Sequence, residues 1–155
     1  MWPRNRRDWP NTIFWCSPVR RFWLKPLRTR GGKRHIQLRA LLRAGLESFQ
    51  RGDYPRSVQS LRNFVNRNRQ SELAPYAHYW IGEAYFAQGK YYESILAYNE
   101  ILTTWAQNER VPAARLRQAE AFAASGDVMD ARLYLKELID KYPGTPEATE
   151  AKRKL

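Results

Sequence analysis

The chain has 155 residues, 43% of them hydrophobic, and a formal net charge of +12. This length suits one compact domain, and the lack of an apolar run of about 18 residues argues against a membrane-spanning helix. Cys16 is the only cysteine and is accompanied by only two histidines, His35 and His78, so the sequence predicts no disulfide framework, no metal site and no cofactor.

The positive charge is concentrated in residues 1–35. This segment holds ten basic residues and one acidic residue, a net +9, whereas residues 36–155 hold 17 basic and 14 acidic residues, a net +3. Four tryptophans and four prolines also lie in the segment, so no helix of any length is expected there. Its apolar stretch, Ile13 to Cys16, is too short for the core of a secretory signal.

Three interpretations of residues 1–35 remain open. Basic residues between aromatic ones could bind single-stranded nucleic acid by phosphate contact and base stacking. The same composition could lie on an anionic membrane surface with tryptophan at the interface. We favour a third interpretation, a disordered or artefactual extension, because the enrichment in Arg, Trp and Pro shows no periodicity.

A repeat of 37 residues organises the remainder of the chain. Gly52, Gly89 and Gly126 stand 37 residues apart, within "FQRGDYPRSVQSL", "FAQGKYYESILAY" and "AASGDVMDARLYL". After each glycine, packing residues recur at the spacing that places them on one side of an α-helix. Each unit is therefore predicted to be two helices joined by a tight turn, at which glycine adopts a positive φ. This turn also accounts for the adhesion-like tripeptide Arg51-Gly52-Asp53.

The repeat, together with the residues that begin and end helices, predicts seven helices, at about 36–50, 54–68, 74–88, 91–106, 111–125, 128–142 and 146–154. Asp53, Asp127 and Thr145 stand where helix N-caps are expected. Small residues at fixed places in the register would let paired helices approach closely; these are Gly45, Gly82, Ala119 and Ala131. The fold class predicted is all-α: a solenoid of three helical hairpins, at about 36–70, 74–107 and 111–143, with a capping helix at 146–155.

These units resemble tetratricopeptide repeats, whose usual length is about 34 residues. Two stretches, "YAHYWIGEAYFAQGKYYESILAYNEIL" and "DARLYLKELIDKYPGTPEATEAKRKL", are similar to the C-terminal domain of the Tol-Pal system proteins YbgF/CpoB, the cell division coordinator. This resemblance covers roughly residues 36–155. Outer-membrane assembly lipoproteins of the β-barrel machinery carry very similar repeats and remain the alternative.

The resemblance implies a binding scaffold without catalysis, located in the periplasm of Gram-negative bacteria. Members of this family bind the protein TolA and help couple outer-membrane constriction to septal wall synthesis. They carry a signal peptide and a trimerising coiled coil, and residues 1–35 show the pattern of neither. The oligomeric state therefore stays open. No nucleophile–histidine arrangement and no phosphate-binding glycine loop is visible in the sequence, so we expect no enzymatic activity.

In a right-handed stack of such hairpins, the first helix of each unit lines the concave surface. We expect this surface to hold an extended or helical peptide through aromatic and aliphatic anchors with a few charges. The residues that the register turns toward it are Arg39, Leu42, Arg43, Leu46, Phe49, Tyr76, Tyr79, Glu83, Phe86, Leu116, Arg117 and Glu120.

Each of these residues could equally serve packing. Arg39 and Arg43 lie one helical turn apart and could pair with a carboxylate of the partner or form a solvated face. Peptide-binding repeats that clamp a C-terminal carboxylate use basic and asparagine side chains on these helices. Asparagine is absent at the matching positions, so the sequence predicts no such clamp.

Overall fold

The computed structural model describes residues 33–155, with side chains from residue 36 onward, and the interpretations of residues 1–32 lie outside the described residues. The described part contains seven α-helices: α3 (Lys33–Gln50), α4 (Tyr54–Arg67), α5 (Ala74–Ala87), α6 (Tyr91–Thr104), α7 (Val111–Ser125), α8 (Val128–Lys141) and α9 (Pro146–Lys154). The all-α fold and the three hairpins with a final helix are confirmed.

The helix boundaries follow the predicted ones closely, with two differences of more than one residue. Helix α3 begins at Lys33, so the end of the basic segment belongs to the first hairpin. Helix α6 ends at Thr104, two residues early, because Trp105 leaves the helical conformation while its N–H still bonds to the carbonyl of Ile101. Both differences fall at helix ends, where side-chain periodicity carries the least information.

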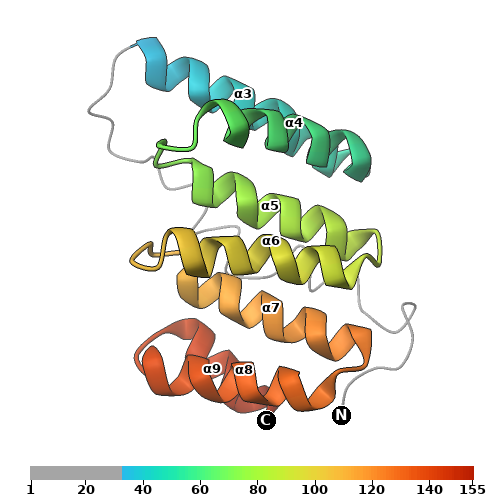
Figure 1. Ribbon diagram of the computed structural model, residues 1–155, viewed down its shortest axis with the longest axis vertical. Coiled ribbons are helices and arrows are strands. Elements are labelled where there is room, and N and C mark those ends of the chain that lie inside the picture. The colour runs from blue at the N-terminus through green and yellow to red at the C-terminus, as the bar shows by residue number, and fades with distance from the viewer. Residues whose placement is uncertain (1–32) are drawn as a thin grey trace.

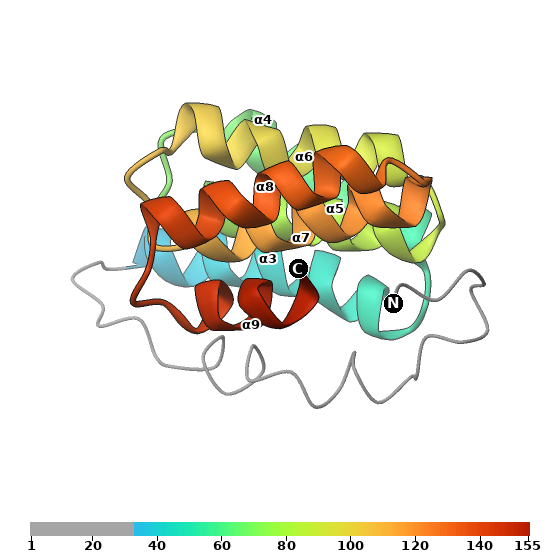
Figure 2. The same cartoon turned by 90° about the horizontal axis from the view of Figure 1, so that it is seen from below.

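The helices form two layers. Each helix packs against the next one along the chain (Figure 1). Figure 2 shows α4, α6 and α8 in one layer, the second-helix layer, and α3, α5, α7 and α9 in the other, the first-helix layer. Helix α9 contacts both α7 and α8, so it covers the third hairpin as a cap.

The three turns within the hairpins depend on glycine. Gly52, Gly89 and Gly126 have φ values of 79°, 73° and 100°, in the left-handed region that other residues rarely adopt. Among the described residues, no other type has a positive φ. The predicted role of the repeated glycine is confirmed, and Arg51-Gly52-Asp53 is the first of these turns.

Two of the three predicted side-chain caps are present. Asp53 Oδ1 accepts a hydrogen bond from the backbone N–H of Arg56 at 3.2 Å, and Thr145 Oγ1 accepts one from Ala148 at 3.2 Å. Asp127 is the N-cap residue of α8, as predicted, but its side chain behaves differently from the other two. This residue precedes α8, but its carboxylate accepts a hydrogen bond from the Ser125 hydroxyl at 2.9 Å and makes no cap hydrogen bond.

Close approach of the paired helices depends on small residues. A Cβ added to Gly45 would lie 2.6 Å from a methyl carbon of Leu61, and one added to Gly82 would lie 2.5 Å from the ring of Tyr98. Leu61 and Tyr98 fill the space that each glycine leaves, and both are fully buried. The third unit holds Ala119 at the matching position.

A buried hydroxyl also ties the two helices in the first two units. Ser57 Oγ donates to the carbonyl of Gly45 at 2.8 Å, and Ser94 Oγ donates to that of Gly82 at 3.0 Å. The third unit has the fully buried Ala131 at the same position. The predicted small positions are therefore confirmed, and in two units they also carry a polar contact.

Candidate peptide-binding site

The first-helix layer carries the predicted contact residues, and the structure divides them into two groups. Eight keep a partly or fully exposed side chain: Arg39, Arg43, Leu46, Phe49, Tyr76, Phe86, Leu116 and Arg117. Four are less than a tenth exposed: Leu42, Tyr79, Glu83 and Glu120.

The prediction that these four line an open surface needs correction. Leu42 and Tyr79 lie in the apolar clusters between helices, because the same register positions also contact the neighbouring helix. Glu83 and Glu120 are buried because each is paired with a cation from another element. These four residues lie beneath the exposed side chains of the first-helix layer and support them.

The two carboxylates belong to an ionic network that crosses α5, α7 and α9. Arg117 binds Glu83 with two hydrogen bonds, from Nε to Oε1 at 2.5 Å and from Nη2 to Oε2 at 2.8 Å. Arg117 Nη1 also donates to Glu120. The other oxygen of Glu120 lies 3.1 Å from Nζ of Lys154 in the capping helix. Two cations therefore neutralise the two buried carboxylates, and Nζ of Lys154 also lies 3.5 Å from Glu150 Oε1.

Aromatic residues enclose this network. Tyr98 from α6 donates its hydroxyl to Glu83 Oε1 at 2.6 Å. The ring of Phe86 lies over the Arg117 guanidinium, with 4.7 Å from Cζ to the ring centroid. This is a cation–π arrangement, so Arg117 is held on two sides by carboxylates and on a third by an aromatic face.

The pKa values follow from this enclosure. Burial lowers the pKa of Arg117, but Glu83 and Glu120 outweigh it and raise the value well above the ordinary one. Burial raises the pKa of Glu120, but Arg117 and Lys154 outweigh it and hold the value below 4.5. Burial, followed by the charge of Glu83, raises the pKa of Tyr98 well above 10.0. Arg117 and Glu120 are therefore charged and Tyr98 is neutral at pH 7.

Trp80 is a surface residue that the sequence analysis missed. Its ring packs edge-on against Phe49 with centroids 5.0 Å apart, which joins α3 to α5 in the first-helix layer. The repeat could have revealed it, because Trp80 stands 37 residues after Arg43 and 37 before Arg117. With Phe49 and Leu46 it forms an apolar surface, half-buried in this structure.

Arg110 is a second missed residue, and no helical register could have placed it, because it precedes α7. Its guanidinium lies 3.8 Å from the ring centroid of Tyr76, and the residue is 4% exposed. Burial lowers the pKa of Arg110 to about 10, against an opposing effect of Glu147. The side chain stays charged at pH 7 and fixes the Tyr76 ring between the second and third units.

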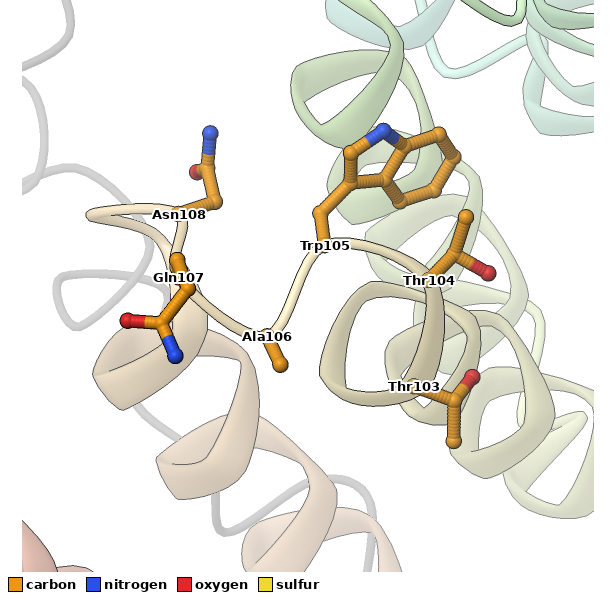
Figure 3. Close-up of a pocket in the computed structure, with 6 residues that line it drawn as sticks. All are labelled: Thr103, Thr104, Trp105, Ala106, Gln107 and Asn108. Atoms are coloured by element: carbon orange, nitrogen blue, oxygen red, sulfur yellow. The ribbon is translucent and has the colours of Figure 1, made fainter.

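A hollow of about 480 Å³ lies at the connection between α6 and α7 (Figure 3). One continuous stretch, residues 103–108, lines it, and the indole of Trp105 projects beside it. None of the six lining residues is ionisable. The hollow is open and formed by the end of α6 and the loop after it, so it lacks the convergent polar groups of a catalytic site.

His78 in α5 packs against Trp105, with ring centroids 5.2 Å apart. Burial lowers the pKa of His78 from 6.5; Glu100 opposes this effect, while Arg69 and Arg62 add to it. In the window between the folded-state pKa and 6.5, the unfolded chain is protonated and the folded chain is not. Stability should therefore fall as the pH is lowered through 6.5, and level off below the folded-state pKa.

We expect the variant His78→Gln to lose this part of the pH dependence. Urea unfolding at about pH 7.5 and about pH 5.5 measures the difference for each protein. The drop between the two pH values should be smaller in His78→Gln than in the wild type. Equal drops in the two proteins would contradict a contribution from His78.

The described residues offer neither a metal site nor a membrane-spanning helix. No group of three or more histidine, cysteine or acidic side chains is positioned to hold a metal ion within residues 36–155. In the same part of the chain, every helix is too short or too polar to cross a membrane.

Comparison with known proteins accounts for the architecture. A sequence profile of the tetratricopeptide repeat matches residues 42–109, and a second profile with the same description matches residues 113–145. The chain belongs to the tetratricopeptide-repeat proteins. No curated protein matches it.

Among solved structures, this tetratricopeptide-repeat protein is similar to the first such domain of Spaghetti (RPAP3), which was solved with the HSP90 peptide SRMEEVD. The two share 20% sequence identity and superpose with a TM-score of 0.60 over 76% of this chain and 88% of the other. At that identity the likeness shows the fold alone.

Proposed function

We propose that this tetratricopeptide-repeat protein is a non-catalytic scaffold that binds a peptide or protein segment on its first-helix layer. The main support is the set of half-exposed apolar side chains on neighbouring helices, with Leu46 and Phe49 on α3 and Trp80 and Phe86 on α5. Such side chains on adjacent helices suit the anchors of a partner segment. The peptide-bound RPAP3 domain, with the same fold, lends further support.

The charges on this layer favour apolar recognition over a carboxylate clamp. Arg117 is held by Glu83 and Glu120, so binding a carboxylate of the partner would require it to leave one of them. Arg43 on α3 is exposed and forms no ion pair with any of the described residues. A partner would thus place apolar side chains over α5, with any acidic residue toward α3.

The finer proposal is a TolA-like partner in the Tol-Pal and cell division system of the bacterial envelope, with the protein in the periplasm. It rests on the resemblance of residues 76–102 and 130–155 to the YbgF/CpoB family. The alternatives are a role like that of outer-membrane assembly lipoproteins, or binding of nucleic acid or membrane through residues 1–35.

Calorimetric titration of the full chain with the purified periplasmic part of TolA tests two claims: that the partner is TolA-like, and that the first-helix layer is the binding site. We expect micromolar binding, weakened about tenfold by Arg43→Glu, because this exposed position borders the apolar surface. The matched control is Arg132→Glu, a charge reversal at an exposed position of α8 in the other layer, which should leave affinity unchanged.

The possible failures are distinguishable. Absence of binding at about 50 µM would dismiss TolA as the partner, while the first-helix layer would stay the proposed site for another segment. Binding that Arg43→Glu and Arg132→Glu weaken equally would show general electrostatic attraction and remove the site from this layer.

A further inference from the structure

Charge is distributed unevenly along the stack, even without the basic N-terminal segment. Residues 36–70, which contain the first hairpin, hold seven arginines and no lysine against two acidic residues, Glu47 and Asp53, a net +5. Residues 71–155 hold ten basic and twelve acidic residues, a net −2. The net positive charge of the folded part therefore belongs to one hairpin.

These arginines lie mostly at the surface. Six of the seven are exposed: Arg43, Arg51, Arg56, Arg62, Arg67 and Arg69. Within the described part of the chain, none of the six forms an ion pair, whereas Arg115, Arg117 and Lys154 of the later helices pair with carboxylates. The first hairpin carries cations that its own fold does not neutralise.

The outward side of α4 shows the contrast most clearly. Arg56, Asn63 and Arg67 are exposed and lie on one side of the helix, since they are seven and eleven residues apart. The exposed residues between them include Gln59 and Asn66, and no acidic residue occurs within α4.

Two positions of α4 match acidic residues in both later hairpins, whereas Arg62 matches Asn99 and Lys136, and Arg67 matches Thr104 and Lys141. Arg56 corresponds to Glu93 and Asp130, 37 and 74 residues later, and Asn63 corresponds to the carboxylates Glu100 and Glu137. Helices α4, α6 and α8 occupy equivalent places in the repeat, and α6 and α8 form there with acidic residues. The fold therefore does not require the basic side chains of α4.

We infer that the α3–α4 hairpin binds the phosphate backbone of nucleic acid, with the outward side of α4 as the centre of the contact. Guanidinium groups match phosphate oxygens in a two-pronged geometry, which explains arginine in place of lysine. The amides of Gln59, Asn63 and Asn66 can donate to phosphates and bond to base edges.

An anionic membrane fits this surface less well. A helix that binds a lipid surface inserts large apolar side chains among its cations. Among the described residues, none of the exposed large apolar side chains belongs to α4. The surface lies mainly in the second-helix layer, so it is distinct from the peptide-binding site proposed on the first-helix layer and from the N-terminal segment.

The repeat itself supplies a matched test. The double variant Arg62→Gln, Arg67→Gln removes two charges from α4, and the control Lys136→Gln, Lys141→Gln removes two charges from the corresponding positions of α8. All four side chains are exposed. The probe is a fluorescein-labelled oligothymidylate of about 20 nucleotides, and anisotropy of the full-length proteins is measured from about 50 to about 200 mM salt.

We expect the α4 variant to bind at least about tenfold more weakly at the lowest salt concentration. The slope of log affinity against log salt should fall by about 1.4, which is two phosphate contacts to a single strand. The α8 control should stay within about twofold of the wild type. Equal effects of the two variants, or no effect of the α4 variant, would overturn the inference, since either result assigns the binding to overall charge or to residues 1–35.

A second α4 variant and a vesicle measurement separate phosphate binding from a loss of folding and from membrane binding. Arg62 lies over the ring of Tyr85, 5.6 Å from its centroid, so the variant Arg56→Gln, Arg67→Gln removes two α4 charges without touching that contact. It should weaken oligonucleotide binding as the first variant does, with an unchanged urea midpoint. Loss of binding to phosphatidylglycerol vesicles with retained oligonucleotide binding would overturn the inference in favour of a membrane.

Discussion

Replacing Arg117 with methionine is expected to lower the free energy of unfolding by about 3–5 kcal/mol, a large part of the stability of a small domain. The side chain is the centre of the ionic network, with Glu83 on one side and Glu120 on the other. Methionine fills a similar volume but leaves Glu83 without its cation, while Glu120 keeps Lys154. Both carboxylates are less than a tenth exposed, so water replaces the lost partner poorly.

Chemical denaturation with urea measures this effect, and a compensating variant shows its origin. Adding Glu83→Gln to Arg117→Met removes the unpaired charge, so most of the lost stability should return. Arg132→Met, at an exposed position of α8, is the matched control and should change the stability by less than about 0.5 kcal/mol. A loss below about 1 kcal/mol in Arg117→Met would mean that the network contributes little, and the absence of recovery would point to a packing defect instead.

The second large effect is expected for Gly82→Ala. A Cβ at this position would lie within 2.9 Å of three ring carbons of Tyr98. The ring is fully buried and its hydroxyl is held by Glu83, so it has little freedom to move. We expect a net loss of about 2 kcal/mol, since overpacking outweighs the better helix propensity of alanine.

The other two units provide the comparisons. In Gly45→Ala the added Cβ lies 2.6 Å from Cδ2 and 2.7 Å from Cγ of Leu61, which is fully buried, so a similar loss of about 2 kcal/mol is expected. The double variant Gly82→Ala, Tyr98→Leu reproduces the pair Ala119 and Leu135 found in the third unit. It should recover at least about 1 kcal/mol relative to the sum of the single changes. If Gly82→Ala had the same urea midpoint as the wild type, the close approach of α5 and α6 would not restrict residue 82 to glycine.

The repeat made the fold predictable, and the site less so. One period of 37 residues placed the turns at Gly52, Gly89 and Gly126, because a positive φ leaves a signature in the sequence. The N-cap position of Asp127 was predicted, but the bonding of its side chain was not, because a capping residue can bond to a nearby hydroxyl as readily as to the backbone. Such local competition has no periodic signal.

At the candidate site, the register identified which residues share a layer but not which of them stay open. Glu83 and Phe86 occupy equivalent sides of α5, yet Glu83 is buried and Phe86 half-exposed. The difference arises because Arg117, 34 residues later, reaches back to Glu83, while Phe86 covers the outer side of that guanidinium. Helical spacing describes one helix, whereas burial depends on its neighbours.

The sequence by itself determined the helical hairpins, their glycine turns, the small residues between paired helices and the basic first unit, because each depends on local conformation or on the composition of one segment. Only the tertiary structure decided that Glu83, Arg117, Glu120 and Lys154 form one network, and that Trp80 joins Phe49 at the surface. These contacts join residues from different helices, and their geometry depends on how the hairpins stack.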